Sequence, residues 1–265
     1  MLSFPRIDPV LFSIGPLSIR WYGLMYVAAF VAAWLLGSYR VRRRKVYGCP
    51  FSPEQFSDIL FWGVAGVVLG ARLGYVLFYK PLEYLNNPWE ILAVWHGGMS
   101  FHGGLAGVLL VLYLAGRRYK CGFLATADFV APLVPPGLFF GRMGNFINGE
   151  LWGRTTTLPW GMVFPGHEAG PFPRHPSQLY EAGLEGLLLF IILWRFSARR
   201  PPVGAVSGLF GLGYGCFRFL VEFVREPDRH LGFIFGGIFT MGMLLCLPMI
   251  LIGALLLWRA YGKSR

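Results

Sequence analysis

The chain has 265 residues, enough for one good-sized domain or two small ones. Hydrophobic residues make up 55% of it and charged residues only 14%, against about 25% charged in an average soluble domain. Its 36 glycines suit helices that pack closely in lipid, where small residues let backbones approach. The composition excludes an ordinary soluble domain and predicts an all-α, polytopic membrane protein that forms a single domain over residues 1–265.

The net charge of +11 raises the alternative of a nucleic-acid partner. The basic residues, however, form short runs between apolar segments, as in cytoplasmic loops of an inner-membrane protein under the positive-inside rule. We therefore expect membrane lipids as partners and no nucleic acid. The runs are RVRRRK (40–45), RRYK (117–120), RFSARR (195–200) and WRAYGKSR (258–265).

Seven segments have about 20 mostly apolar residues, the length that crosses the hydrocarbon core. Each basic run follows an odd-numbered segment, so one orientation places all of them in the cytoplasm. We expect seven transmembrane helices, with the N-terminus outside and the C-terminus in the cytoplasm. The segments cover about 18–39, 56–79, 98–116, 122–140, 179–196, 204–224 and 234–258.

Two connections on the outer side are long. Residues 80–97 contain Pro-Leu and Asn-Pro breaks and suggest an interfacial element. Residues 141–178 are rich in Pro and Gly and too polar to span, so we expect an irregular periplasmic segment there. The first apolar run lacks a basic leader and a small-residue cleavage site, and no cleavable signal peptide is expected.

The cysteines and the GLGYG motif indicate no redox, metal or nucleotide site. Cys49, Cys121, Cys216 and Cys246 are widely spaced, without CxxC or a metal-ligand spacing to histidine, so we expect neither a disulfide framework nor zinc. GLGYG (211–215) lies inside an apolar span, where helix packing explains its glycines better than dinucleotide binding does.

Ionisable residues inside spans are costly and therefore candidates for function. Arg218 and Glu222 are four residues apart, on one face of a helix. They either neutralise each other, or Glu222 holds Arg218 for an anionic ligand. Arg142 falls at similar depth, with Arg154 following in the adjacent loop. One glutamate cannot neutralise them all, which favours an anion such as phosphate, well suited to the arginine fork.

Histidine and tyrosine side chains at the outer ends of spans leave alternatives open. His102, in MSFHGGLAG (99–107), is either structural or a general base, with glycines leaving room for a ligand or another backbone. Tyr22 belongs either to an interfacial aromatic belt or to a site. Arg72 lies inside the second span, and nothing in the sequence decides its role.

His175, Ser177 and Glu181, in RHPSQLYE (174–181), bring together residue types found in hydrolases. No G-x-S-x-G elbow or H-E-x-x-H helix accompanies them. The segment is instead typical of a helix start, with Ser177 as the cap.

The polar stretch GRMGNFINGELWGR (141–154) closely resembles the signature of the bacterial prolipoprotein diacylglyceryl transferase family. Further blocks resemble the same family in the same order, from the first span to the outer end of the sixth. They are WYGLMY, GARLGYVLFY, GGMSFHGGL, RHPSQLYE, GAVSGLFGLGYG and FRFLVEFVREPD.

The resemblance implies a seven-span body with its site open to the periplasmic side. It also implies transfer of the diacylglyceryl group of phosphatidylglycerol to the lipobox cysteine of a preprolipoprotein, with no metal or cofactor. A thioether forms and glycerol 1-phosphate leaves. Family positions fall on Arg142, Asn145, Glu150 and Gly153 in the signature, and on Tyr22, His102, Tyr214, Arg218 and Glu222 elsewhere.

Within that reaction, we expect Arg142 and Arg218 to clamp the phosphodiester. His102 is the first choice of base for the thiol and Glu150 the second. Substrate-binding roles fall on Tyr22, Asn145, Gly153, Tyr214 and Glu222. The alternative from another class is a transporter or lipid-binding protein that uses the same arginines without breaking a bond.

Overall fold

The structure is a computed structural model that describes residues 2–5, 7–15, 17–166, 168–227, 232–235 and 239–262. The chain divides into two compact units. The first joins Met1–Leu36 to Asp128–Arg265, and the second is Gly37–Ala127. Helix α1 (Trp21–Arg42) runs from the first unit into the second, and α6 (Phe123–Val130) runs from the second into the first.

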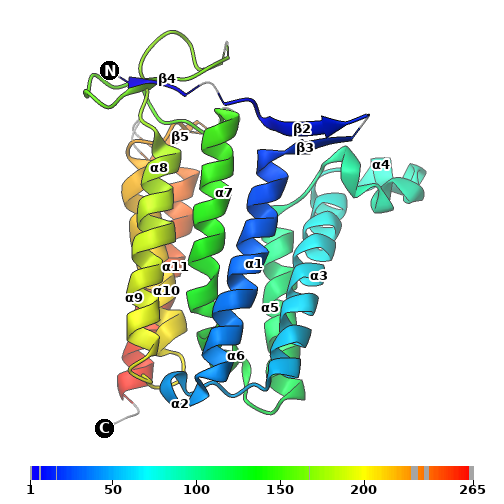
Figure 1. Ribbon diagram of the computed structural model, residues 1–265, viewed down its shortest axis with the longest axis vertical. Coiled ribbons are helices and arrows are strands. Elements are labelled where there is room, and N and C mark those ends of the chain that lie inside the picture. Colours follow the sequence, from blue (N-terminus) through cyan, green and yellow to red (C-terminus); the bar gives the residue numbers. More distant parts are fainter. Residues whose placement is uncertain are drawn as a thin grey trace. The chain divides into compact units, whose positions relative to one another are not determined.

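In the first unit, short strands precede α1 (Figure 1). Strands β2 (Val10–Ile14) and β3 (Leu17–Arg20) form an antiparallel hairpin. Strand β1 (Leu2–Ser3) pairs in parallel with β4 (Met162–Val163), which lies far along the chain. The first helix therefore begins at Trp21, because residues 17–20 pair as a strand instead of opening the span.

The helices of the first unit carry the polar site. After α6 come η3 (Ala131–Leu133) and α7 (Val134–Asn148). A second run joins α8 (Ser177–Glu181), the π-helical η4 (Ala182–Leu188) and α9 (Leu189–Ser197). Helix α10 (Ala205–Glu222) leads to the antiparallel strands β5 (Phe233–Phe235) and β6 (Phe239–Thr240) and to α11 (Met241–Gly262).

Helix α7 extends further than the sequence predicted. It continues through residues 141–148 and ends at Gly149, whose left-handed backbone (φ +67°) closes the helix. The expectation that all of 141–178 is irregular was wrong for this part. Glycine there serves packing, since a Cβ on Gly144 would lie 3.0 Å from the Tyr22 ring. Similarly, α11 begins at Met241, because Phe239–Thr240 pairs as a strand.

Glycines allow α10 and α11 to pack closely against each other. A Cβ on Gly208 would lie 2.9 Å from the Gly253 carbonyl oxygen, and a Cβ on Gly253 would lie 2.4 Å from the Leu212 nitrogen. A side chain at Gly213 would likewise lie 2.8 Å from Leu189 in α9. The GLGYG motif therefore packs helices, as the sequence indicated.

The second unit is built on α3 (Pro53–Phe78) and α5 (Phe101–Arg118). Their backbones meet at glycines: a Cβ on Gly70 would lie 2.4 Å from the Gly103 carbonyl oxygen, and one on Gly107 would lie 2.0 Å from that of Gly66. The glycines after His102 therefore make room for another backbone, one of the alternatives left open. The unit also contains α2 (Arg44–Tyr47), α4 (Pro81–Asn86), η1 (Pro88–Leu92) and η2 (Val94–His96).

Four segments are long and apolar enough to cross a membrane by length and composition, within the described residues: α1, α3, the run Phe123–Asn148, and α11. The fold is therefore mostly helical, with several apolar helices. Helices α5, α8–α9 and α10 lie at the other predicted spans, and the total of seven crossings stays a prediction.

Arg72 is a buried anchor for the segment after α3. Its guanidinium donates to the carbonyls of Ile91 (3.0 Å) and Ala93 (3.2 Å) and packs over the Tyr84 ring. Three more carbonyls, those of Glu90, Gly97 and Gly98, accept hydrogen bonds from the same side chain. Its role, which the sequence left undecided, is thus to hold residues 84–98 on the end of α3.

We expect Arg72→Lys to lower stability by at least about 2 kcal/mol, because an ammonium has three donors and cannot serve these carbonyls. Thermal unfolding in detergent checks this. Arg118→Lys is the matched control, since Arg118 is exposed on α5. Equal melting temperatures for the two variants would contradict the anchoring role.

Candidate active site

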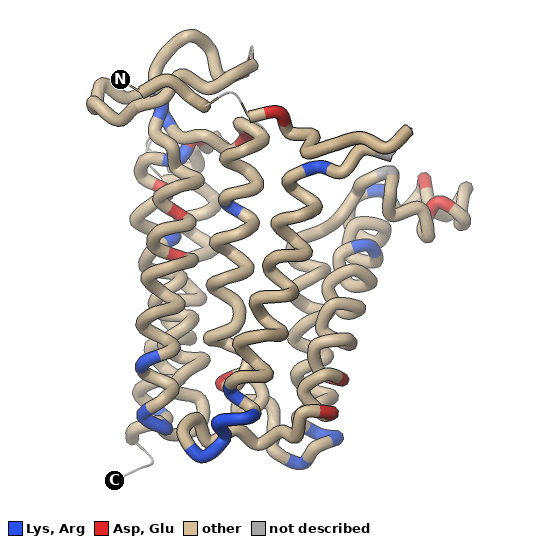
Figure 2. The backbone as a smooth tube through the Cα atoms, viewed as in Figure 1, with Lys and Arg blue, Asp and Glu red and all other residues tan. Residues whose placement is uncertain are grey.

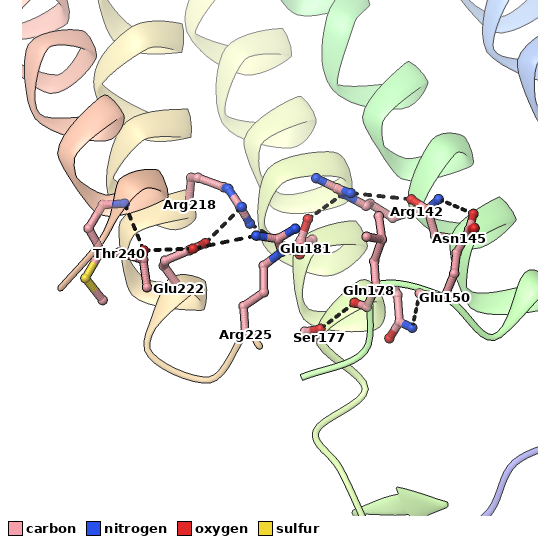
Figure 3. Close-up of polar contacts among 12 residues, drawn as sticks. Arg142, Asn145, Glu150, Ser177, Gln178, Glu181, Arg218, Glu222, Arg225 and Thr240 are labelled. Carbon is pink, nitrogen blue, oxygen red and sulfur yellow. Dashed lines mark hydrogen bonds and ion pairs between the residues drawn. The ribbon is translucent and has the colours of Figure 1, made fainter. Parts of the chain in front are cut away.

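A buried cluster of guanidinium and carboxyl groups lies in the first unit, where α7, α8 and α10 supply its members (Figure 3). Glu181, at the end of α8, occupies its centre and is fully buried. Its carboxylate forms an ion pair with Arg142 Nε through Oε2. Through Oε1 it lies 3.3 Å from Arg218 Nη1 and 4.0 Å from Arg225 Nε. One carboxylate thus joins three guanidiniums from different parts of the chain.

Glu222 extends the cluster toward α11. Its Oε2 lies 2.8 Å from Arg218 Nη2, and its Oε1 lies 3.6 Å from Arg225 Nη1. Thr240 donates its hydroxyl to Glu222 Oε1 (2.9 Å) and accepts from the backbone nitrogen of Met243 (3.3 Å). The predicted contact between Arg218 and Glu222 is confirmed, and Glu222 also holds the start of α11.

The signature stretch forms a second polar chain beside Arg142. Arg142 Nη1 donates to Asn145 Oδ1 (3.4 Å), and Asn145 Nδ2 donates to Glu150 Oε1 (2.8 Å). Asn148 Nδ2 also donates to that Glu150 oxygen (3.4 Å). Asn145 is buried and Glu150 is exposed, so the chain connects the interior of the cluster to its surface.

Gly153 lies at a junction of three segments. It pairs with Arg225 in a β-bridge, and its nitrogen donates to the His175 carbonyl (2.8 Å). A Cβ there would lie 2.5 Å from the Val224 carbonyl oxygen and 2.7 Å from His175 Cβ. Only glycine fits, so Gly153 positions Arg225, whereas a substrate contact remains a prediction.

Arg154 secures the same junction. Its Nε donates to the Arg225 carbonyl (3.0 Å), its Nη2 donates to the Glu222 carbonyl (3.3 Å), and its guanidinium packs over the Phe233 ring at 5.0 Å. These contacts make Arg154 a brace for the chain after α10.

Side chains at the start of α8 fasten the loop that follows the signature. Ser177 Oγ donates to the Leu151 carbonyl (3.0 Å), and Gln178 Nε2 donates to the Glu150 carbonyl (2.6 Å). The prediction that Ser177 caps the helix was wrong: Pro176 occupies the cap position, with no side-chain cap bond. The serine hydroxyl is used for a tertiary contact instead.

Two tyrosines belong to the surroundings of the site: Tyr214 interacts electrostatically with Arg218 and Arg142, and Tyr22 interacts with Asn145 and Glu150. Tyr22 shares a hydrogen bond with the Tyr26 hydroxyl (3.2 Å) and faces Gly144 of the signature helix. Tyr214 stacks on Phe210 (5.9 Å) and packs against the apolar cluster that contains Leu189. Substrate-binding roles for both stay predictions.

His102 belongs to the second unit. It lies in the first turn of α5, which Ser100 caps, and its exposed ring meets Phe101 edge to face. Its proposed role as base stays a prediction.

The sequence reasoning missed three members of the site. Glu181 was interpreted as part of an ordinary helix start, and Glu185 and Arg225 were not singled out. A signal was present, since Glu181 and Glu185 are four residues apart at the start of an apolar run and thus on one helix face. The argument that one glutamate faces several arginines was wrong, because Glu181 pairs with them as well.

His175 offers a pH readout of this junction. Burial lowers the pKa of His175, whose Nδ1 lies 3.2 Å from the Tyr180 hydroxyl. The imidazole of the unfolded chain then binds a proton more readily than that of the folded chain. The free energy of unfolding is therefore highest above a pH of about 6.5, where His175 is neutral in both states, and it decreases as the pH falls below that value.

We expect His175→Gln to reduce the fall in melting temperature between about pH 8 and about pH 5, by no more than about 2 °C. Thermal scans at both pH values measure it. An equally steep fall in the variant would assign the pH dependence to other groups.

Apolar helices and a charged cluster buried among them define a multi-pass membrane protein with an internal polar site. The family model described as prolipoprotein diacylglyceryl transferase matches residues 9–259. The chain therefore belongs to the prolipoprotein diacylglyceryl transferase family.

Named relatives agree with this assignment. The chain is 60% identical over 257 residues to the phosphatidylglycerol–prolipoprotein diacylglyceryl transferase of Nitratidesulfovibrio vulgaris strain DP4, covering 97% of this chain and 96% of the relative. It is 55% identical over 265 residues to the protein of the same name from Pseudomonas aeruginosa strain LESB58, covering 100% and 97%. The predicted family and its transferase class are confirmed.

Proposed function

We propose that the protein transfers the diacylglyceryl group of phosphatidylglycerol to the lipobox cysteine of a preprolipoprotein in the bacterial inner membrane. The observation that carries this proposal is the convergence of Arg142 and Arg218, from different helices, on the carboxylate of Glu181. These two guanidiniums hold a carboxylate between them, and the same arrangement can bind the anionic oxygens of a phosphodiester.

We further propose seven crossings with the N-terminus outside, which would put this site on the periplasmic side. Within the first unit, basic residues lie where α9 ends, while a mixed group of basic and acidic residues lies in the opposite half (Figure 2). Basic residues in the last turns of α9 and α11, Arg195 and Arg259, support a cytoplasmic location of that end under the positive-inside rule.

The chemistry is a substitution at the carbon of the diacylglyceryl unit that is bonded to the phosphate oxygen. The cysteine sulfur forms a bond to this carbon, the carbon–oxygen bond breaks, and its electron pair leaves with glycerol 1-phosphate. The thiol proton passes to a base, because the thiolate is the nucleophile. Arg142 and Arg218 stabilise the charge that develops on the departing phosphate.

His102 is the first candidate for the base and Glu150 the second. We expect His102→Gln to lower kcat by about 100- to 10,000-fold, the usual contribution of a general base. Parallel kinetics of Glu150→Gln separate the candidates. Full rate for His102→Gln at every pH would remove the histidine from this role.

The test of the function uses purified protein, phosphatidylglycerol and a lipobox peptide. Release of glycerol 1-phosphate and a peptide mass increased by one diacylglyceryl group are expected. A Cys→Ser peptide should give neither product. Lipid binding or movement without bond cleavage would favour a transporter, and phosphate release with the serine peptide would contradict the thiol mechanism.

A further inference from the structure

Glu185 is a buried acidic residue that the proposed mechanism does not use. Its exposed fraction is 0%, and within the described residues neither carboxyl oxygen has a hydrogen-bond partner. It lies one turn after Glu181 in the π-helical segment η4, a kind of distortion that often occurs at functional sites. A buried polar group without partners requires an explanation.

Ionisable groups from several elements interact with Glu185. Glu181 precedes it on the same helical run, Arg142 comes from α7, and Arg218 and Tyr214 come from α10. Further electrostatic contributions come from Arg225, after α10, and from Cys246 in α11. Glu185 thus belongs to the arginine cluster electrostatically, although it forms no ion pair with another described residue.

The charges of the cluster have two possible totals. Three guanidiniums (Arg142, Arg218 and Arg225) face the carboxyl groups of Glu181, Glu222 and Glu185. If Glu185 is ionised, the total is zero. If it carries a proton, one positive charge remains. Including Arg154 and Glu150, at the edge of the site, changes neither total.

The contacts identify the group that carries the proton. Glu181 and Glu222 each lie within ion-pair distance of two or more guanidiniums, which favours their charged forms. Among the described residues Glu185 has no such contact, its side chain is fully buried, and an isolated carboxylate in that position is costly.

We propose that Glu185 holds a proton in the resting site, so that the cluster keeps one positive charge, which the single negative charge of a phosphodiester then neutralises. This inference rests on the proposed function, since the phosphodiester is that of phosphatidylglycerol. Glu185 acts through the arginines as a positioning residue. Its ionisation would weaken lipid binding by cancelling the charge that attracts the phosphate.

Lipid binding without peptide tests this, because no reaction can then occur and the phosphodiester itself does not titrate. The Kd for phosphatidylglycerol is measured in neutral detergent from about pH 6 to about pH 10, for wild type and Glu185→Gln. We expect the wild-type Kd to rise by about tenfold per pH unit on the alkaline side. The variant, permanently neutral, should show no such rise and should bind more tightly than wild type there.

Glu226→Gln is the matched control, since it removes the partly exposed carboxylate that pairs with Arg174 and should keep the alkaline rise. A Glu185→Gln variant that binds more weakly at every pH, or shows the wild-type rise, would overturn the inference. If that variant does not fold, calorimetry of wild type in two buffers decides: uptake of about one proton with the lipid at alkaline pH is expected. No uptake at any pH would refute it.

The outcomes separate this inference from the proposed function. If phosphatidylglycerol binds with the expected pH dependence but wild type forms no thioether product, the function fails and the role of Glu185 stands. If product forms but the pH dependence of lipid binding is the same in wild type and Glu185→Gln, the proposed function stands and the role of Glu185 fails.

Discussion

Arg142→Lys and Arg218→Lys are each expected to lower kcat/KM for phosphatidylglycerol by about 100- to 1,000-fold while leaving the protein folded. Each substitution keeps the positive charge. It removes the planar fork that grips two phosphate oxygens at once, for which an ammonium is no substitute. The loss therefore measures geometry rather than charge.

The two arginines differ in what else they hold. Arg218 contacts Glu181 and Glu222, so its guanidinium is fixed from both sides. Arg142 contacts Glu181 and reaches Asn145, which leads to Glu150. Arg218→Lys should therefore act mainly through the phosphate, whereas Arg142→Lys should also loosen the signature chain.

Steady-state kinetics with a lipobox peptide, together with melting temperature, check both variants. Arg195→Lys is the control, because Arg195 is exposed in the last turn of α9. Wild-type kinetics in both site variants would refute the clamp, and a large fall in melting temperature would show that the pairs serve mainly stability.

Much of the helical framework was predictable because length and hydropathy are local properties. The helices lie where the apolar segments indicated, and the spacing of Arg218 and Glu222 correctly placed them in contact. Failures occurred where glycine and polar residues were interpreted as loop. Residues 141–148 are helical, and Gly144 there packs against Tyr22, a contact with a distant segment that the sequence alone does not show.

The candidate site was only half predictable for the same reason. Arg142 and Arg218 were found because a charge in an apolar span is conspicuous. Glu181 was missed because it lies at the edge of a polar segment, where a charged side chain is expected to be solvated and gives no sign of burial. Only the fold shows that this edge is the fully buried centre of the cluster. Likewise, nothing in the sequence shows that Arg72 and Arg154 bind backbone carbonyls.

Gly153→Ala is expected to cause the second large loss. The new methyl group would lie 2.5 Å from the Val224 carbonyl oxygen, 2.7 Å from His175 Cβ and 2.9 Å from the His175 carbonyl oxygen. Two of these three atoms belong to backbone, which cannot rotate away, so the segments must separate at a cost of about 1–3 kcal/mol. The segment containing Val224 also carries Arg225, whose guanidinium completes the ring around Glu181.

The activity of Gly153→Ala should therefore fall further than its stability. We expect kcat/KM to drop at least about tenfold at temperatures where the variant remains folded, since misplacing a positioned group by about 1 Å can cost about 100-fold. Gly141→Ala is the matched control from the same signature: it lies within α7 with nothing within 4 Å of the added carbon. There the methyl group should be neutral or slightly stabilising.

Parallel melting curves and kinetics of these two alanine variants separate packing from chemistry. Wild-type activity and melting temperature for Gly153→Ala would show that the junction can open freely, contrary to its tight geometry. Lost activity at an unchanged melting temperature would instead point to direct contact between Gly153 and substrate. The expected combination, both quantities lowered in Gly153→Ala and neither in Gly141→Ala, makes the glycine a structural support for Arg225.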